Sequence, residues 1–251
     1  IGSFPSLQEI SIYTTQADNV TLRDLWRAHY RAILAANAVV AFTPDSPDET
    51  LTTEERNQYV AEAKFMRSLL MFQLVNLYAQ PVNIGGEDAL GIPIVTDAFS
   101  GEITNYSRNT VGEVHAFIIN ELNAIVADLP DTYATSAFTR GRATKGAANA
   151  LLSRIHLYRG EWQLAAEKAK AVLDAEDIYG LASNYNFWGE NNIEYVFSIQ
   201  NSEIDNGRTG SGGWGSYYNS AEDGGRGDAP FSDYLLEAYA ATDKRLTALS
   251  K

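Results

Sequence analysis

The sequence predicts a mainly α-helical fold of tetratricopeptide-like helix hairpins, with long irregular loops and a minor β element. Apolar residues recur at intervals of three and four over several long segments, which is the period of a helix with one buried face. Thr52 with Glu55, and Thr110 with Glu113, have the spacing of capping boxes, which begin helices. The segment Gly160–Ala165 carries the turn, aromatic and small residues of a tetratricopeptide hairpin.

The period and its interruptions locate the long helices. They are expected over residues 21–42, 52–80, 110–128, 144–159 and 161–175, with Pro44, Pro81, Pro130 and Gly160 at or just after their ends. The segment 81–109 contains glycine and proline without a helical period, and loops of that length are usually functional or disordered. We therefore expect a helical scaffold with one long excursion between its second and third helices.

The last two of these helices match the tetratricopeptide spacing most closely. Leu152, Gly160, Trp162, Ala165 and Leu173 stand where that repeat places its apolar, turn, aromatic, small and apolar residues. Ala165 should let the two helices approach closely, and Trp162 is expected to wedge beneath the turn. Because one such hairpin cannot bury its own apolar face, the earlier helices should stack on it.

The remainder of the chain has a different pattern. Glu194–Gln200 alternates apolar and polar residues and predicts a short strand. The segment 201–228 is rich in glycine, and a last helix is expected over 231–241. This part of the chain is where irregular structure should be concentrated.

The composition excludes several classes of function. The 251 residues carry a formal net charge of −13, which opposes binding to nucleic acids and anionic lipids and favours a neutral partner. Cysteine is absent, so disulfides, thiolate catalysis and cysteine-based zinc or iron–sulfur sites are excluded. No run of about 18 uncharged apolar residues predicts a membrane span.

Residues that could carry catalysis are poorly spaced. His29, His115 and His156 lie in different expected helices, and we interpret them as packing or surface residues. The segment 141–146 lacks the Gly-Lys-Ser/Thr ending of a phosphate loop. The catalytic residues of an enzyme are therefore not apparent, and we expect no cofactor.

Acidic residues leave two smaller possibilities open. Asp223 and Asp228 could form a glycosidase pair, but the glycine-rich segment gives them no rigid support. A structural cation could sit near Asp45, Asp48 and Glu49, although their spacing does not require one. We expect neither enzyme activity nor a metal site.

Aromatic residues in the glycine-rich part are the candidates for ligand binding. Trp214, Tyr217, Tyr218 and Asn219 lie together without a helical face to belong to, and Trp188 stands in a similar context. Exposed aromatic rings beside polar groups can stack on a sugar ring or on a partner side chain. The other interpretation is that they pack under the loop as a small separate cluster.

Several sequence blocks occur in a recognisable order. The most specific is Ala61–Val75, AEAKFMRSLLMFQLV. The others are Trp-x-x-x-Tyr-x-x-Ile-x-x-x-Asn at Trp26–Asn37, Gly-Ile-Pro at 91–93, 108–113 with 129–130, 141–145 with 147–152, 160–162 with Ala165, and the segment 194–200. In these blocks the chain resembles the SusD/RagB family of outer-membrane nutrient-binding lipoproteins.

The resemblance implies a tetratricopeptide-based fold that captures a glycan or other nutrient, lipid-anchored on the extracellular face of the outer membrane. It implies a TonB-dependent, SusC-like outer-membrane transporter as partner, over which such proteins act as a lid, and a role in polysaccharide utilisation. It implies no invariant ligand-binding motif. We expect one SusD-like domain over residues 1–251, without the family's N-terminal lipid anchor and part of its C-terminal region.

The leading hypothesis is therefore an oligosaccharide-binding protein that delivers its ligand to a transporter. The alternative is a tetratricopeptide-type adaptor that binds a peptide on its helical face, in a groove lined by the fourth and fifth helices. A glycosidase is the third possibility, and hydrolysis of a glycoside would distinguish it from both.

Overall fold

The computed structural model describes residues 4–183, 192–201, 213–218, 220–222, 224–228 and 232–245. The chain divides into two compact units, one of residues 22–181 and 190–198 and one of residues 1–21, 182–189 and 199–251. The fold is mainly helical, as predicted. None of the helices in these described segments combines the length and the hydropathy needed to cross a membrane.

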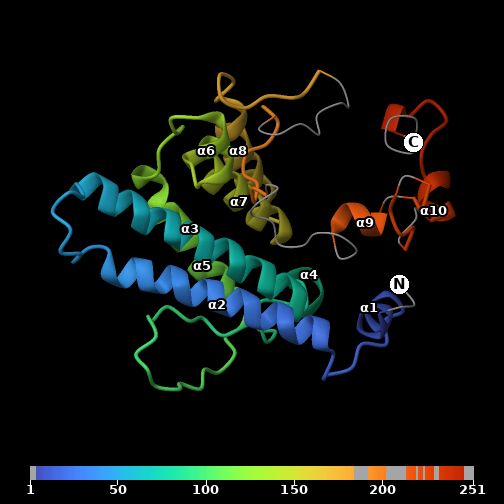
Figure 1. Cartoon of the computed structure of the whole chain (residues 1–251), viewed down its shortest axis with the longest axis horizontal. Coiled ribbons are helices and arrows are strands. Elements are labelled where there is room, and N and C mark those ends of the chain that lie inside the picture. The colour runs from blue at the N-terminus through green and yellow to red at the C-terminus, as the bar shows by residue number, and fades with distance from the viewer. Residues whose placement is uncertain are drawn as a thin grey trace. The chain divides into compact units, whose positions relative to one another are not determined.

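The larger unit is built on two long helices, α2 (Val20–Phe42) and α3 (Thr53–Tyr78), which lie side by side in Figure 1. The helix α3 begins at the expected capping box, in which Thr52 and Glu55 satisfy each other's backbone amides. A four-residue helix, α4 (Val82–Gly85), follows it. The predicted bounds of both long helices are confirmed to within a few residues.

The helix α5 (Val111–Ile125) packs on α3 and continues into a 3-10 turn, Val126–Asp128. Its capping box of Thr110 and Glu113 is also as predicted. A short helix that the sequence pattern did not indicate, α6 (Ser136–Gly141), begins where the Thr135 hydroxyl accepts a hydrogen bond from the amide of Phe138. Thr135 is a good N-cap, but six residues are too few to show a helical period.

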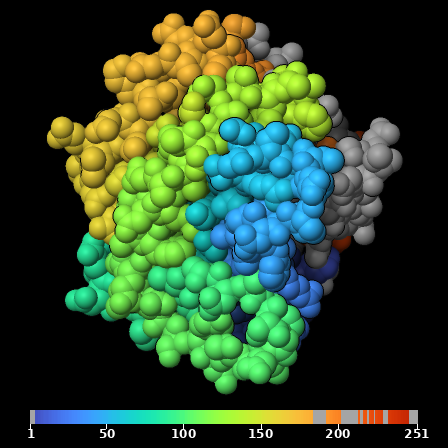
Figure 2. All heavy atoms as spheres, turned by 90° about the vertical axis from the view of Figure 1, so that its left-hand side faces the viewer, coloured from blue at the N-terminus to red at the C-terminus, as the bar shows by residue number. Residues whose placement is uncertain are grey.

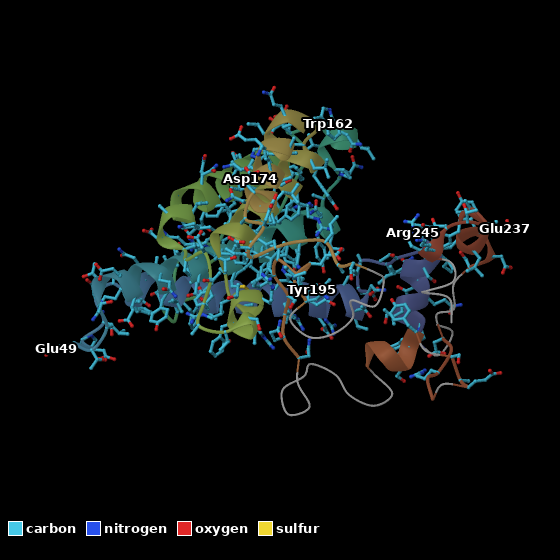
Figure 3. All side chains as sticks on the ribbon, turned by 90° about the horizontal axis from the view of Figure 1, so that it is seen from above. Glu49, Trp162, Asp174, Tyr195, Glu237 and Arg245 are labelled. Carbon is cyan, nitrogen blue, oxygen red and sulfur yellow. The ribbon has the colours of Figure 1, made fainter. Side chains whose placement is uncertain are left out.

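The predicted hairpin is formed by α7 (Lys145–Tyr158) and α8 (Trp162–Leu173). Gly160 has a φ of 76°, the left-handed conformation that this turn requires, and Ala165 is buried between the helices. The expectation for Trp162 is met only in part. Its ring lies against the turn, with Cζ2 3.7 Å from where a Cβ at Gly160 would stand, but the residue is 67% exposed and is therefore not buried beneath the turn. Figure 3 shows Trp162 toward the outer edge of the hairpin.

The core of this unit lies where α3, α5 and α7 meet. Its fully buried side chains include Phe65, Met71, Leu74, Ile118, Leu122, Leu152 and Ile155. A salt bridge is buried beside it, between Arg67 on α3 and Glu121 on α5. The long helices therefore present one continuous apolar interior, as the helical period predicted.

The predicted strand at 194–200 is absent. Within the described residues, β structure is limited to an isolated antiparallel bridge between Leu90 and Thr110. Phe197 packs edge-on against Phe65, whereas Ile199 is 70% exposed, so the apolar alternation does not correspond to one buried face. The amide of Ser198 donates to the carbonyl oxygen of Arg140. Arg140 belongs to helix α6, so this hydrogen bond is not part of a β-sheet.

The other unit contains three short helices among its described residues: α1 (Pro5–Ser11), α9 (Trp214–Tyr218) and α10 (Asp233–Glu237). The last lies inside the predicted helix 231–241 but is shorter. Ser232 begins it by accepting a hydrogen bond from the amide of Leu235. The described part of this unit has no fully buried large side chain, in contrast to the core around α3.

Candidate functional site

The long excursion between α3 and α5 is an ordered loop with a closed stem. The Gly91 amide donates to the Asn109 carbonyl oxygen at 2.7 Å, and the Asn109 amide donates to the Ile92 carbonyl oxygen at 3.1 Å. The Arg108 guanidinium donates to the carbonyl oxygens of Gly91 and Leu90 on the opposite side of the stem. These contacts bring the ends of the excursion together, and we call residues 95–107 the pocket loop.

The pocket loop and α2 enclose a pocket of about 520 Å³, a size typical of small-ligand sites. Its lining residues are Tyr30 and Leu34 of α2 with Val95, Asp97, Ala98, Phe99, Ser100, Glu102, Ile103, Thr104 and Tyr106 of the loop. Figure 1 shows the loop (green) running beside α2, and Figure 2 shows it at the lower edge of the face displayed. The pocket is thus formed by one helix face and one loop.

Aromatic and polar groups both line this pocket. Phe99 is 66% exposed and Tyr106 is partly exposed, so both rings are accessible to a ligand. The Tyr106 hydroxyl donates to Oδ2 of Asp97 at 3.4 Å. The lining residues contain two carboxyl groups, Asp97 and Glu102, and no basic side chain. This combination suits a ligand with apolar faces and many hydroxyl groups but no negative charge.

The base of the pocket is held by hydrogen bonds from α2. The Tyr30 hydroxyl donates to the Pro93 carbonyl oxygen at 2.8 Å, and burial raises the pKa of this phenol above its ordinary value, so it remains a donor. Nδ2 of Asn37 donates to the carbonyl oxygens of Val95 and Asp97, each at 3.0 Å. The loop therefore starts from a fixed position on the helix.

A larger hollow, of about 620 Å³, lies between α2 and α3 and has a different chemistry. Its lining is mainly alanine and other aliphatic side chains, with Tyr59 and Glu62. Glu62 is already bound by the guanidinium of Arg142, at 2.6 and 2.9 Å. Since few polar groups remain to recognise hydroxyls, this groove is a poor sugar site compared with the pocket of the loop.

The aromatic candidates in the glycine-rich part are only partly within the described residues. Trp188, Asn219 and the side chain of Trp214 lie outside them. Tyr217 is half-buried, with its ring centroid 5.8 Å from that of Phe4 and 5.2 Å from the guanidinium carbon of Arg226. Tyr218 is 59% exposed. The two tyrosines thus differ in exposure, and Tyr218 is the more accessible to a ligand.

The remaining sequence candidates for chemistry are engaged in structural contacts. His29 bonds to the Leu25 carbonyl oxygen and to Gln73, and Nδ1 of His156 lies 2.5 Å from Glu161. Asp228 is paired with Arg226 at 2.6 Å, while its proposed glycosidase partner, Asp223, lies outside the described residues. These contacts leave the described candidates with ordinary structural roles.

Residues 141–146 and 45–49 also have structural roles. Arg142 pairs with Glu62, and the Thr144 hydroxyl accepts from the Ala147 amide at the start of α7. Asp48 accepts hydrogen bonds from the amide and hydroxyl of Thr50, which lower the pKa of its carboxyl group. Throughout the described segments, no three His, Asp or Glu side chains are grouped to hold a metal ion.

Sequence reasoning identified the excursion 81–109 but none of its pocket residues. The available signal was the cluster of Phe99, Ile103 and Tyr106 in a loop without helical period. Their assembly with Tyr30 and Leu34 depends on the tertiary position of α2, about seventy residues earlier in the chain. The spacing of residues along the sequence does not show that α2 packs against the loop.

A family model named SusD-like and described as "Starch-binding associating with outer membrane" matches residues 3–157. The chain is 28% identical over 237 residues to SusD-like protein P2 of Formosa agariphila, an alignment that covers 91% of this chain and 43% of that one. The chain therefore spans less than half the length of this relative.

Two solved structures are similar to this one. A SusD-like carbohydrate binding protein from Bacteroides fragilis has a TM-score of 0.72 and 24% identity, over 92% of this chain and 44% of that chain, and supports the fold. A laminarin binding SusD-like protein has a TM-score of 0.55 and 27% identity, over 65% of this chain and 33% of that chain. The pocket of the loop lies within the residues that the family model matches.

Proposed function

The chain belongs to the SusD-like family, which is described as starch-binding and associating with the outer membrane, and from this premise we propose that it binds an oligosaccharide in the pocket of the loop. One observation carries the proposal: accessible aromatic rings and hydrogen-bonding groups converge in a pocket of about 520 Å³. A sugar needs both, because its ring has an apolar face and its edge is lined with hydroxyls.

Each group in the pocket has a role in this binding. The rings of Phe99 and Tyr106 stack on sugar faces, while Asp97 and Glu102 accept hydrogen bonds from sugar hydroxyls. Ser100 and Thr104 donate or accept as the ligand requires. Because many hydroxyls of the sugar must lose water on binding, the affinity of a single site is modest.

Neutral glucans are the proposed ligand class. The carboxyl groups of Asp97 and Glu102 and the net charge of −13 would repel uronic acids and sulfated sugars. The family description names starch, and the name of one similar structure names laminarin. Both are neutral glucose polymers, so α-linked and β-linked glucans are the first ligands to test.

In the proposed cellular role, the protein is lipid-anchored on the extracellular face of the outer membrane. It captures the oligosaccharide without cleaving it and passes it to a TonB-dependent, SusC-like transporter. The helical scaffold would form the wall that faces this transporter. The family's association with the outer membrane and the resemblance of the sequence blocks support this role.

The aromatic segment Trp214–Asn219, together with Trp188, is retained as a second proposed contact for the ligand. Tyr218 is exposed and could stack on a sugar, whereas Tyr217 is held by Phe4 and Arg226. Trp214→Ala is therefore part of the experiment.

Calorimetric titration with laminarihexaose and maltoheptaose tests the proposal. Phe99→Ala and Tyr106→Ala should each weaken binding of the glucan that the wild-type chain prefers by about tenfold, because losing a stacked ring removes roughly 1–2 kcal/mol. Trp214→Ala should weaken it if that segment contributes. No release of reducing sugar should accompany binding.

Phe138→Ala is the matched control, because it removes an aromatic ring that is 55% exposed on α6, outside the pocket. Its affinity should equal that of the wild-type chain. If Phe99→Ala and Tyr106→Ala also bind normally, the pocket of the loop is not the glycan site. If only Trp214→Ala binds weakly, the site moves to the glycine-rich segment.

A peptide-binding adaptor is the second candidate because three helices line a further pocket of about 450 Å³. It is lined by residues of α2, α3 and α7, including His29, Gln73 and Arg154. The expected groove between the fourth and fifth helices would instead involve α8, which contributes none of these lining residues. Binding of a peptide library that Arg154→Ala abolishes, with indifference to glucans, would favour this alternative.

A further inference from the structure

One buried side chain, Asn37, connects the pocket loop directly to helix α2. Within the described residues, the hydrogen bonds that join residues 95–107 to a helix both come from Asn37, through its Nδ2 to Val95 and Asp97. Asn37 is fully buried and does not line the pocket. Asn37 therefore contacts the loop without contacting a ligand bound in the pocket.

The orientation of the Asn37 amide is set by Arg67. Nη1 of Arg67 donates to Oδ1 of Asn37 at 2.7 Å. A guanidinium offers only donors, so the oxygen of the amide must face it and the NH₂ group must face the loop. In the reverse orientation, the NH₂ group of Asn37 would face the Arg67 guanidinium, and two donors would oppose each other. Oδ1 of Asn37 would then face the carbonyl oxygens of Val95 and Asp97, and no solvent reaches this buried site to compensate.

Arg67 is held in turn from α5. Its Nε donates to Oε2 of Glu121 at 3.1 Å, and its Nη2 bonds to Oε1 of the same carboxylate. The Ser68 hydroxyl also donates to Glu121, at 2.9 Å. The side chains of Arg67 and Glu121 are only 5% and 8% exposed, so both are fixed by the core. A continuous hydrogen-bond network thus runs from Glu121 on α5 through Arg67 on α3 and Asn37 on α2 to the loop.

We propose that Asn37 is a positioning residue for the ligand pocket, with its amide oriented by the buried Arg67–Glu121 pair. The amide fixes Val95 and Asp97, and these set the course of the loop that carries Phe99 and Tyr106. Affinity for the ligand therefore depends on three buried residues that do not touch it. This inference rests on the proposed function for its effect on affinity, but not for its effect on the loop.

Two sets of variants test this hydrogen-bond network. Asn37→Asp keeps an acceptor for Arg67 and removes the amide donors to the loop. The double variant Arg67→Met with Glu121→Leu leaves Asn37 in place but removes what orients it, and it replaces a buried ion pair by apolar groups, which proteins often tolerate. Ser68→Ala is the control, because it weakens the same network without touching Arg67 or Asn37.

Hydrogen exchange of the free protein reports the loop directly. Both sets of variants should speed exchange of the amides in residues 95–107 about tenfold, while the exchange rates in α3 stay at their wild-type values. Ser68→Ala should leave the exchange rates of the loop unchanged. The effects should not add when all three substitutions are combined, because they break one chain of contacts. Unchanged loop exchange in both sets would overturn the proposal.

Glucan titration of the same variants supplies the second readout. Affinity should fall about tenfold for both sets and remain at the wild-type value for Ser68→Ala, although that control also loses some stability. Full affinity in both sets would overturn the link between Asn37 and the ligand. If the wild-type chain binds no glucan, the proposed function fails, and hydrogen exchange alone decides whether Asn37 positions the loop.

Discussion

His115 shows how the core sets the chemistry of a single residue. Its side chain is buried on α5 beside Phe72, with ring centroids 6.2 Å apart. Burial, with a smaller contribution from the Arg159 guanidinium, lowers the pKa of His115 to about 4, against attraction from Glu87 and Glu161. The imidazole is therefore neutral at physiological pH and behaves as a packing residue.

This burial predicts a pH dependence of stability. Between pH 6.5 and about 4 the unfolded chain binds a proton at His115 and the folded chain does not, so stability falls as the pH falls through this window. The full effect is on the order of 3 kcal/mol. Urea unfolding of wild type and His115→Leu at pH 7 and pH 4.5 measures it.

The His115→Leu variant should lose less stability on acidification than the wild-type chain, because it lacks the group that protonates only on unfolding. Carboxyl groups also titrate in this range, and the difference between the two proteins removes their contribution. Equal losses in both proteins would show that His115 is accessible to protons in the folded state.

At the scale of single residues, the candidate site was only partly predictable. The histidines were interpreted as packing or surface residues, and their contacts agree with that interpretation. The exposed Phe99 and the helix residue Tyr30 were not selected, because the first lies in a segment without period and the second has the spacing of any core aromatic. Their common pocket arises from packing, which residue spacing does not encode.

At the scale of elements, caps and breakers explain why the helix bounds were predictable. Capping boxes begin α3 and α5, the Thr144 hydroxyl begins α7, and Gly160 ends it in a left-handed conformation. These are local interactions, so they can be read from neighbouring residues. The predicted strand at 194–200 failed because a strand needs a partner, and its neighbours are helices.

Two glycines near α7 give a test of this local account. A methyl group at Gly146 would overlap the ring of Tyr179, whose hydroxyl lies 2.9 Å from Thr144. Gly146→Ala should therefore destabilise the protein by about 2–3 kcal/mol, the upper part of the range for overpacked cores. Gly160→Ala should lose about 1–2 kcal/mol because its φ is positive.

Gly180→Ala is the control for both, since its added methyl would meet Ile193 at an ordinary distance of 3.6 Å. Its stability should stay within about 0.5 kcal/mol of wild type in denaturant unfolding. A Gly146→Ala protein as stable as this control would mean that Tyr179 does not pack against α7.

At the scale of the whole molecule, the pocket belongs to the larger unit, in which α3, α5 and α7 form the core. The helices act as a rigid support, and the binding groups are carried by a loop, a division common in binding proteins. The buried hydrogen-bond network of Glu121, Arg67 and Asn37 connects the helices to the loop. It is a reason for the loop to be ordered despite its length.

The central claim is that an oligosaccharide binds between the pocket loop and α2. A crystal structure of the chain with the better-binding glucan tests it most directly. We predict a sugar ring stacked on Phe99 or Tyr106, with hydroxyls hydrogen-bonded to Asp97 or Glu102. A glucan bound elsewhere, with the pocket of the loop holding only water, would contradict the account.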